Sequence, residues 1–289
     1  MMPSLTTDIP TRTIKIRYFL FLSATVFILS CKTTAVTKVV EETIVVQKDI
    51  PLREYSVQSV LWQQLSAEYK ALSYQAFNLA QMQLDEMIAA EDQSEKPFAI
   101  VTDIDETVLD NSPYNAKMIE DDREYESVSW KAWGMLEQAT AVPGALDFFN
   151  YAQSKGVEVF YISNRKEIQK AETMSNLKKL GFPYVDEEHF LLRTAESGKE
   201  ARRQIVSENK NIIMLLGDNL SDFSDLFDDK STKERNQVVE ELKADFGKKF
   251  IVLPNPMYGD WEMNGIYEDS YQWTPAQKDS LRKAKLISY

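Results

Sequence analysis

The stretch F-A-I-V-T-D-I-D-E-T, residues 98–107, decides the fold, because it joins a short apolar run directly to a group of acidic side chains. A continuous apolar run of this length is typical of a strand that is buried on both faces. Similar runs follow along the chain, at residues 157–163, 189–193, 212–217 and 250–253. Amphipathic stretches alternate with them, at residues 144–155, 166–180, 196–209 and 220–245. This alternation predicts an α/β fold in which helices cover both faces of a parallel sheet.

Polar side chains close three of the predicted strands, in the segments DIDET (103–107), SNR (163–165) and GDN (217–219). Right-handed crossovers bring the carboxyl ends of parallel strands to one edge of the sheet. Ligands of open α/β sheets bind at that edge. We therefore expect these three segments to form one site.

The acidic pair Asp103 and Asp105 indicates a bound cation or unequal protonation, because two neighbouring carboxylates repel each other. Hard dications take oxygen ligands, and Mg²⁺ usually adds waters and substrate phosphate. A calcium loop of the EF-hand type is excluded, because Val108 and Tyr114 occupy the positions that need Gly and Glu. An Asp that caps a helix beside a solvated neighbour is the simpler alternative for this segment.

The amino-acid composition limits the kinds of site and of partner that this chain can have. The 289 residues include one Cys and one His, so an internal disulfide and a zinc site rich in Cys or His are excluded. The formal net charge of −12 argues against a general nucleic-acid binder, which would present a basic face. Hydrolytic chemistry in this chain would therefore use carboxylates, hydroxyls, amines or an oxygen-bound metal.

Residues 1–30 are predicted to be a lipoprotein signal peptide. Basic residues precede an apolar run at 18–29, and such a run covers about 18 Å as a helix, too short for a bilayer core of about 30 Å. Ser30 directly before Cys31 resembles a bacterial lipobox, in which the Cys becomes the lipidated first residue of the mature protein. A buried Cys after a short anchor helix is the alternative.

The mature chain is predicted to begin with a tether at 31–53, in which Lys32 would indicate the outer membrane of the bacterial cell envelope. Apolar residues then recur at helical spacing over 54–91. We expect this helix to fold together with the C-terminal segment as a small helical domain above the site. The predicted division is a helical segment, an α/β core and a C-terminal segment, at residues 54–96, 97–257 and 258–289.

The order D-x-D-x-T, Ser, Lys and G-D-x-x-x-D resembles the haloacid dehalogenase superfamily of phosphotransferases. The segments DIDETVLDNSPY, AVPGALDF, FYISNR, GDNLSDF and LPNPMYGDWE look like the class C acid phosphatases, which are secreted bacterial lipoprotein 5′-nucleotidases. The resemblance covers residues 54–275 and implies a three-layer sandwich with a parallel sheet, together with a smaller helical domain.

The resemblance also implies roles for the residues at the strand ends. Asp103 would be the nucleophile that forms an aspartyl-phosphate, and Asp105 would act as general acid and base. Ser163 would donate a hydrogen bond to the phosphoryl group, together with the Asn164 backbone. Lys199 would supply positive charge to the phosphoryl oxygens. Each of these residues also has a simpler structural explanation. Ser163 and Asn164 can cap a helix, and Lys199 can be a solvated surface lysine, as most Lys side chains are.

The implied metal is Mg²⁺, held by Asp103, Asp218 and the Asp105 backbone carbonyl. Asp222 would orient metal-bound water without binding the metal directly. These four aspartates are the proposed machinery among the 45 acidic residues of the chain.

Substrate recognition is assigned to aromatic side chains and to Arg165. The family stacks a nucleobase or nicotinamide ring between aromatic residues, and Trp130 and Tyr258 lie at the spacing of that pair, with Tyr114 nearby. Stacking of a base on an aromatic side chain contributes about 1–3 kcal/mol per base. The alternative is that these aromatic residues belong to the core.

The resulting prediction is an Mg²⁺-dependent phosphomonoesterase that acts on nucleoside 5′-monophosphates and related small esters. A phosphatase for non-nucleotide esters, such as pyridoxal phosphate or aryl phosphates, is an alternative. A non-catalytic surface lipoprotein that binds ligands is a further alternative. No nucleic-acid polymer is expected as a partner, Cys31 would attach the protein to the membrane, and the resemblance suggests a homodimer.

Overall fold

The computed structural model describes residues 51–90, 95–268, 270 and 272–289. The predicted signal peptide, the lipidation site at Cys31 and the tether as far as residue 50 lie outside these described residues. The described residues fall into a single compact unit.

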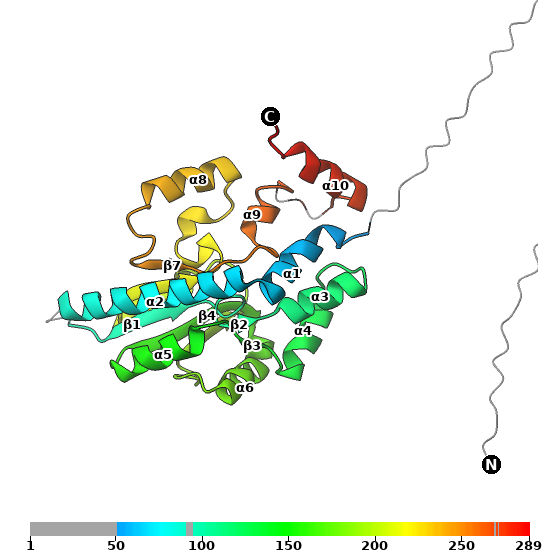
Figure 1. The fold of residues 1–289 in the computed structure, drawn as a ribbon. Helices are drawn as coiled ribbons and strands as arrows, with labels where there is room; N and C mark the ends of the chain where they lie inside the picture. The colour runs from blue at the N-terminus through cyan, green and yellow to red at the C-terminus, as the bar shows by residue number, and fades with distance from the viewer. Residues whose placement is uncertain (1–50, 91–94, 269, 271) are drawn as a thin grey trace, which may run out of the picture. The chain divides into compact units, whose positions relative to one another are not determined.

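The centre of the molecule is a parallel sheet of five strands in the order β5-β4-β1-β6-β7 (Figure 1). In chain order the strands of this sheet are β1 (Phe98–Thr102), β4 (Glu158–Lys166), β5 (Phe190–Arg193), β6 (Asn211–Gly217) and β7 (Phe250–Val252). The short strands β2 (Leu109–Asp110) and β3 (Thr140–Ala141) pair antiparallel outside it. All five predicted strands are confirmed to within a few residues, and the central strands β1 and β6 are almost entirely buried, as continuous apolar runs predict.

Helices cover both faces of the sheet and make a three-layer sandwich. The long helices are α1 (Val57–Leu65), α2 (Ala67–Ala90), α3 (Ser112–Glu120), α4 (Ser127–Leu136), α5 (Ala145–Ser154), α6 (Lys170–Leu180), α7 (Glu200–Asn209), α8 (Thr232–Glu241) and α10 (Pro275–Ala284). The shorter turns are α9 (Asp260–Met263) and the 3₁₀ helices η1 (Glu54–Ser56), η2 (Glu167–Gln169), η3 (Leu220–Asp222) and η4 (Asp225–Phe227). The predicted α/β sandwich with a parallel sheet is therefore confirmed.

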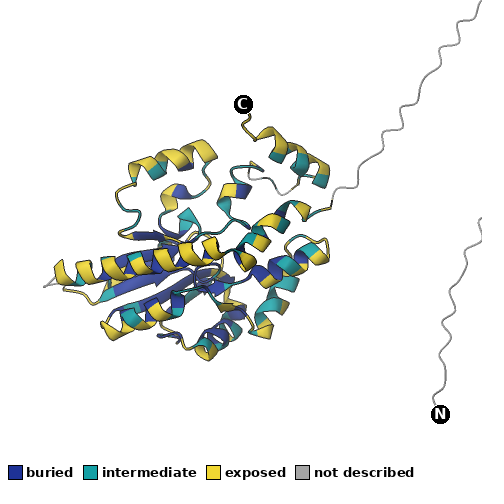
Figure 2. Cartoon of the chain, viewed as in Figure 1, coloured by how far each residue is buried: buried dark blue, intermediate teal, exposed yellow. Residues whose placement is uncertain are grey.

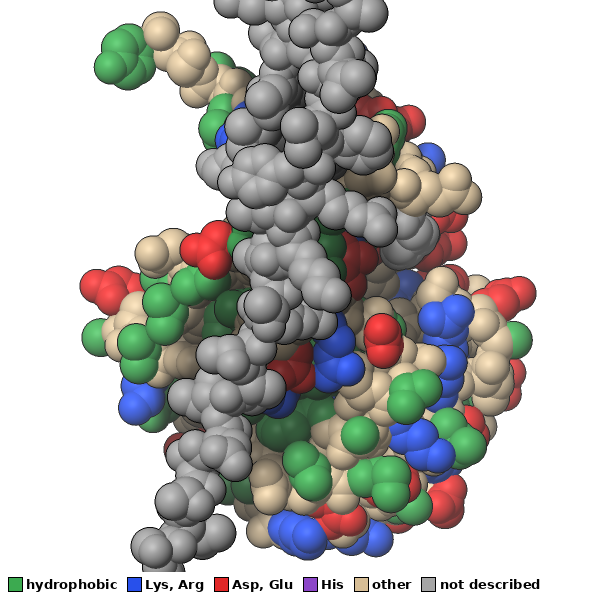
Figure 3. Space-filling model, turned by 90° about the vertical axis from the view of Figure 1, so that its right-hand side faces the viewer, with side chains coloured by type: hydrophobic (Ala, Val, Ile, Leu, Met, Phe, Trp, Pro, Cys, Tyr) green, Lys and Arg blue, Asp and Glu red, His purple; other side chains and the backbone are tan. Residues whose placement is uncertain are grey.

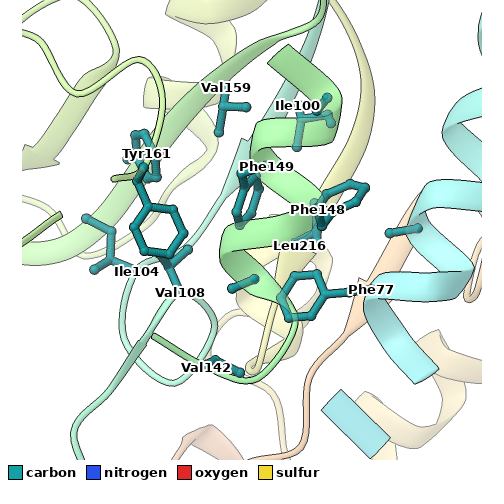
Figure 4. Packing of buried hydrophobic residues seen from close by; sticks show 14 of the residues in the cluster. Phe77, Ile100, Ile104, Val108, Val142, Phe148, Phe149, Val159, Tyr161 and Leu216 are labelled. Carbon is teal, nitrogen blue, oxygen red and sulfur yellow. The ribbon is translucent and has the colours of Figure 1, made fainter. Parts of the chain in front are cut away.

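The two faces of the sheet carry separate apolar clusters because side chains alternate along each strand. Ile100 of β1 packs on one face with residues of α2, α5 and α6, and its neighbours Ala99 and Val101 pack on the other face with Val206 of α7. Figure 4 shows the larger cluster, in which Phe77 of α2 lies 5.7 Å from Phe148 of α5 between ring centroids. The sheet that carries the polar strand ends is thus fixed from above and below.

The predicted helix over 54–91 is corrected to two helices, α1 and α2, that meet at Ser66. The backbone of Ser66 is extended, with ψ of 136°, and its side chain accepts a hydrogen bond from the backbone N–H of Tyr69. Serine competes for backbone hydrogen bonds in this way, and apolar periodicity carries no sign of it. The predicted amphipathic stretch 220–245 is likewise divided, into η3, η4 and α8.

The structure also changes the predicted role of the N-terminal helical segment. Helix α2 packs on α5 and β7, so it is a layer of the sandwich and not a part of a separate small domain (Figure 1). Residues near the two ends of the described chain do meet between η1 and α10, where the Arg282 guanidinium lies 4.0 Å from the centroid of the Tyr55 ring.

The distribution of buried and exposed residues follows from the three layers. Figure 2 shows buried residues concentrated on the sheet and on the inward faces of the helices, and exposed residues on their outer faces. On the uncovered part of the face in Figure 3, acidic and basic side chains are interspersed with hydrophobic ones. No helix among the described residues is both long enough and apolar enough to pass through a bilayer.

Candidate active site

The register of the sheet brings the acidic strand ends together. Thr102 at the end of β1 is level with Leu216 of β6, and the N–H of Asp103 donates to the Leu216 carbonyl over 3.0 Å. Asp103 and Asp218 therefore follow neighbouring strands at the same edge. One carboxylate oxygen from each of Asp103, Asp218 and Asp222 lies within 4.8 Å of the others. The structure thus brings these acidic side chains together at the edge where the sequence predicts a site.

Lys199 is the cation at the centre of this acidic group. It precedes the first residue of α7, and its buried ammonium donates to Asp103 Oδ1 and, over 2.6 Å, to Asp222 Oδ1. A solvated lysine is thereby ruled out. We call Asp103, Lys199, Asp218 and Asp222 the floor of the site.

The floor carries more negative charge than its one lysine can balance. Burial raises the pKa of Asp103 to about 7, with Lys199 lowering it and the charges of Asp222 and Asp105 raising it further. Burial also raises the pKa of Asp218 well above its ordinary value, and the carboxylates of Asp222 and Asp103 add to the effect. A divalent cation fits this donor set, because it would remove the repulsion among buried oxygen ligands of the kind that hard cations prefer.

Asp222 reaches the floor through a tight turn next to a glycine. Its Oδ2 accepts the N–H of Asn219 over 3.0 Å in the capping box of η3. A Cβ atom added at Gly217 would lie 2.4 Å from the Asp222 side chain, closer than any real Cβ contact. The site therefore requires glycine directly before Asp218.

Two residues without an assigned role hold Asp218 in place. Thr107 Oγ1 donates to Asp218 Oδ1 over 3.1 Å, and Asn255 Nδ2 donates to Asp218 Oδ2 over 2.8 Å. Thr107 belongs to the acidic segment 103–107, so its position in the sequence already indicates that it lies near the site. Asn255 follows the last strand, and no sequence pattern there indicates that its side chain reaches Asp218.

Asp105 lies beside the floor and is bound by residues from other elements. Its Oδ1 accepts hydrogen bonds from Arg165 Nε over 2.9 Å and Nη2 over 2.8 Å, and from Asn111 Nδ2 over 2.9 Å. Arg165 lines the pocket, and its predicted contact with substrate stays a prediction, since its buried guanidinium is engaged with Asp105, Asn111 and Thr173. Arg165 closes a buried strand, and the sequence pattern does not reveal which way its side chain turns.

Ser163 and Asn164 lie at the end of β4, where both face the same group of polar contacts. The Ser163 hydroxyl is buried and accepts the N–H of Arg165 over 3.0 Å. Arg202 of α7 holds this turn by donating to the Ser163 carbonyl over 2.6 Å and to Asn164 Oδ1 over 2.8 Å. A buried arginine thus ties the second polar segment to the helix that begins at Lys199.

Above the floor is a pocket of about 470 Å³. Its wall includes the predicted aromatic residues Tyr114, Trp130 and Tyr258, together with Tyr125, which the sequence reasoning missed. We call these four residues the rim. The rings of Tyr114 and Trp130 meet edge to face at 5.0 Å between centroids. Tyr125 lies in the loop before α4, where no periodic signal marks it.

Residues near the two ends of the described chain complete the wall of the pocket. Arg53 and Tyr55 contribute from the N-terminal side, and Tyr267 and Lys278 contribute from the C-terminal side. Lys278 is paired with Glu124, so α10 is tied to the loop between α3 and α4. The expectation that the two chain ends lie above the site therefore holds for these residues.

Comparison with known proteins agrees with this arrangement. The chain is 45% identical to the class C acid phosphatase from Bacillus anthracis, whose structure superimposes with a TM-score of 0.79 over 83% of this chain and 100% of that chain. The structure of that enzyme with tungstate bound matches equally well. The stem 31 kDa glycoprotein of Glycine max is 27% identical over 202 residues, which are 68% of this chain and 69% of the relative.

Acid phosphatase 1 of Solanum lycopersicum is 24% identical over 163 residues, which are 55% of this chain and 57% of the relative. The family model described as HAD superfamily, subfamily IIIB (Acid phosphatase) matches residues 22–261 and so includes every residue of the floor and the rim. The chain belongs to this family, the subfamily IIIB acid phosphatases of the HAD superfamily.

Proposed function

We propose that this acid phosphatase hydrolyses nucleoside 5′-monophosphates and related small phosphate esters with Mg²⁺, through an aspartyl-phosphate intermediate. The observation that carries the proposal is the pairing of Lys199 with both Asp103 and Asp222 beneath a pocket walled by aromatic rings. This combination provides a nucleophile, a fixed positive charge and a surface for a planar leaving group in one pocket.

The proposed reaction has two displacement steps at phosphorus. In the first, a carboxylate oxygen of Asp103 forms a bond to phosphorus while the bond to the leaving oxygen breaks, and Asp105 gives that oxygen a proton. In the second, a water oxygen forms a bond to phosphorus while the bond from phosphorus to Asp103 breaks, Asp105 takes a proton from that water, and inorganic phosphate leaves. Lys199 and the end of β4 stabilise the equatorial oxygens, so the work is mainly positioning and neutralisation of charge.

Asp103 and Asp218 are the side chains that would hold the metal, and Asp222, which has a carboxylate oxygen within 4.8 Å of theirs, would orient metal-bound water. A bound Mg²⁺ supplies positive charge to the phosphoryl oxygens and to the floor. All the side-chain ligands in this set are carboxylate oxygens, which hard cations such as Mg²⁺ prefer. The same carboxylates also attract other hard divalent cations.

The aromatic rim supports a substrate with a planar ring. Trp130 and Tyr258 both line the pocket, and a ring stacked on an aromatic side chain gains about 1–3 kcal/mol. The Bacillus anthracis relative has been solved with tungstate bound, and its binding of an oxyanion supports a phosphate ester as the substrate of this chain. Ring stacking also suits pyridoxal phosphate and aryl phosphates, which remain the second candidate class.

A panel of phosphate esters tests the proposal. Purified protein is treated with a chelator, restored with Mg²⁺ or other divalent cations, and assayed with nucleoside 5′-monophosphates, pyridoxal phosphate, an aryl phosphate and glycerol phosphate. We expect Mg²⁺ to restore activity and nucleotides to have the highest kcat/KM. Equal kcat/KM for nucleotides and glycerol phosphate would contradict the role of the rim, and full activity in chelator would contradict the metal.

We also propose that the protein is exported and held at the bacterial cell envelope by lipid on Cys31. The support is the position of the lone Cys at the end of a short apolar run. The Cys31→Ser variant should appear in the soluble fraction with unchanged kcat and KM. A variant that stays with membranes would contradict the lipid anchor.

A further inference from the structure

The carboxylate of Asp105 is held at one oxygen only. Three N–H groups converge on Oδ1, two from Arg165 and one from Asn111, at 2.8–2.9 Å. Among the described residues, Oδ2 has a single long contact, 3.5 Å from the hydroxyl of Ser163. Asp105 also lines the pocket, and 18% of its side chain is exposed. The two oxygens of this carboxylate are therefore not equivalent.

The orientation of Asn111 is determined by its other partners. Its Oδ1 accepts hydrogen bonds from Trp133 Nε1 over 2.9 Å and from Arg165 Nη2 over 3.2 Å. The indole N–H can only donate, so the oxygen of the amide must point toward Trp133. The amide nitrogen then points toward Asp105, and its donation to Oδ1 is fixed by the network.

The guanidinium of Arg165 is fixed just as firmly. Only 3% of the side chain is exposed, and Nη1 donates to Thr173 Oγ1 over 3.2 Å. Its charged carbon lies 5.3 Å from the centroid of the Trp130 ring. The guanidinium is planar, Trp130 packs on one side of it, and its N–H groups are already bonded. It therefore has little freedom to turn toward a phosphoryl group.

We propose that Arg165 and Asn111 are positioning residues, which hold Oδ1 of Asp105 and leave Oδ2 as the oxygen that exchanges the proton with the leaving group. This inference rests on the proposed function. A proton on Oδ1 would displace one of its three donors, whereas Oδ2 can take a proton without loss of a short hydrogen bond.

The proton transfer is balanced by the two steps already given. As the bond between phosphorus and the leaving oxygen breaks, the proton moves from Oδ2 to that oxygen, and a carboxylate remains on Asp105. That carboxylate, still bound by its three donors at Oδ1, later takes a proton from the attacking water through Oδ2. The network thus keeps the same oxygen in use for both steps.

The choice of leaving group tests the inference, because an alkoxide needs the proton and a nitrophenolate departs without it. The test measures kcat for a nucleoside 5′-monophosphate and for 4-nitrophenyl phosphate in the wild type, Arg165→Lys and Asn111→Asp. Lysine keeps the charge of Arg165 but loses the two parallel donors. The aspartate variant still accepts from Trp133 but cannot donate to Asp105.

We expect kcat for the nucleotide to fall about 100-fold in each variant, while kcat for 4-nitrophenyl phosphate changes about threefold or less. Retained activity with the nitrophenyl ester also shows that the variant is folded. Asn176→Asp is the matched control for Asn111→Asp, since Asn176 is another buried asparagine, and its amide is bonded to the backbone of Ala139. That control should leave the ratio of the two kcat values unchanged.

Equal losses of kcat for both esters, or a change confined to KM, would overturn the inference while leaving the phosphatase intact. A wild type that hydrolyses neither ester in the presence of Mg²⁺ would instead overturn the proposed function. If a variant does not fold, the other variant decides, because the two residues donate to Oδ1 from separate elements.

Discussion

The floor and the rim of the pocket differ in how they are built. The floor residues follow strands or begin a helix on the sheet, and the oxygens of Asp103 and the ammonium of Lys199 are fixed by buried contacts. The rim residues come from short helices and loops, and Tyr125 is more than half exposed. A site can thus have a rigid part that performs the chemistry and a looser part that accepts the leaving group, so the two parts should respond differently to substitution.

The largest effect is expected at the floor. Asp103→Asn removes the nucleophile and should lower kcat at least about 1,000-fold, because no other group can form the covalent intermediate. Thermal unfolding should show that the fold is kept, since asparagine has almost the same shape. Turnover by Asp103→Asn at more than a few per cent of the wild-type rate would contradict Asp103 as the nucleophile. The floor could then no longer be distinguished from the rim as the part that performs the chemistry.

A smaller effect is expected at the rim. Trp130→Ala should raise KM for a nucleotide about tenfold, because loss of one stacking contact costs about 1–3 kcal/mol. Glycerol phosphate is the control substrate, since it has no ring to stack, and its KM should change little. A fall in kcat with both substrates would show that Trp130 acts on the chemistry and not on binding.

The charge of the floor predicts an unusual response of stability to pH in the metal-free protein. In the folded state the pKa of Asp103 is raised to about 7 and that of Asp218 is raised well above its ordinary value, so the folded protein keeps protons that the unfolded chain releases above about pH 4. The contribution of each group to stability is therefore present below about pH 4 and is lost as the pH rises through its folded pKa, which for Asp103 is about 7.

Melting temperatures in chelator at pH 5 and pH 8 measure this effect. Asp218→Asn is the comparison, because it lacks one of the two raised carboxyls, and the difference between wild type and variant should change by a few °C across this range. Excess Mg²⁺ should reverse the sign, since a cation favours the charged carboxylates. An identical pH dependence in both proteins would contradict the electrostatic account of the floor.

The smallest effect is expected at the outer wall. Lys278→Met breaks the ion pair with Glu124, whose side chain is 44% exposed, and such pairs contribute about 0–1 kcal/mol. We expect a change in melting temperature of a few °C at most and nearly unchanged kcat. A large loss of kcat would show that α10 belongs to the chemistry, and the distinction between floor and wall would then fail.

The same contrast explains what the sequence could predict. Apolar runs such as 98–102 and 212–217 mark strands directly, and parallel strands must end at one edge, so the position of Asp103 beside Asp218 follows from pattern alone. Only the family resemblance assigns the aromatic residues Tyr114, Trp130 and Tyr258 to the pocket, because the local sequence does not show where the short helices α3 and α4 and the loop at Tyr258 lie relative to the sheet.

The contacts missed by the sequence analysis depend on side-chain direction. Arg165 and Asn111 are 54 residues apart, and nothing in either local pattern indicates that both turn toward Asp105. The break at Ser66 depends on one hydroxyl that competes for a backbone hydrogen bond. In each case the deciding interaction is a single polar contact set by the tertiary fold.

The tight packing at Gly217 bears on which relatives of this chain can stay active as their sequences change. A methyl group at this position would collide with the carboxyl group of Asp222, so a Gly217→Ala descendant would keep all four aspartates of the proposed machinery and still have a displaced site. Counting acidic residues would class such a descendant as active. The residue directly before Asp218 is therefore a more sensitive marker of inactivation by drift than any of the aspartates.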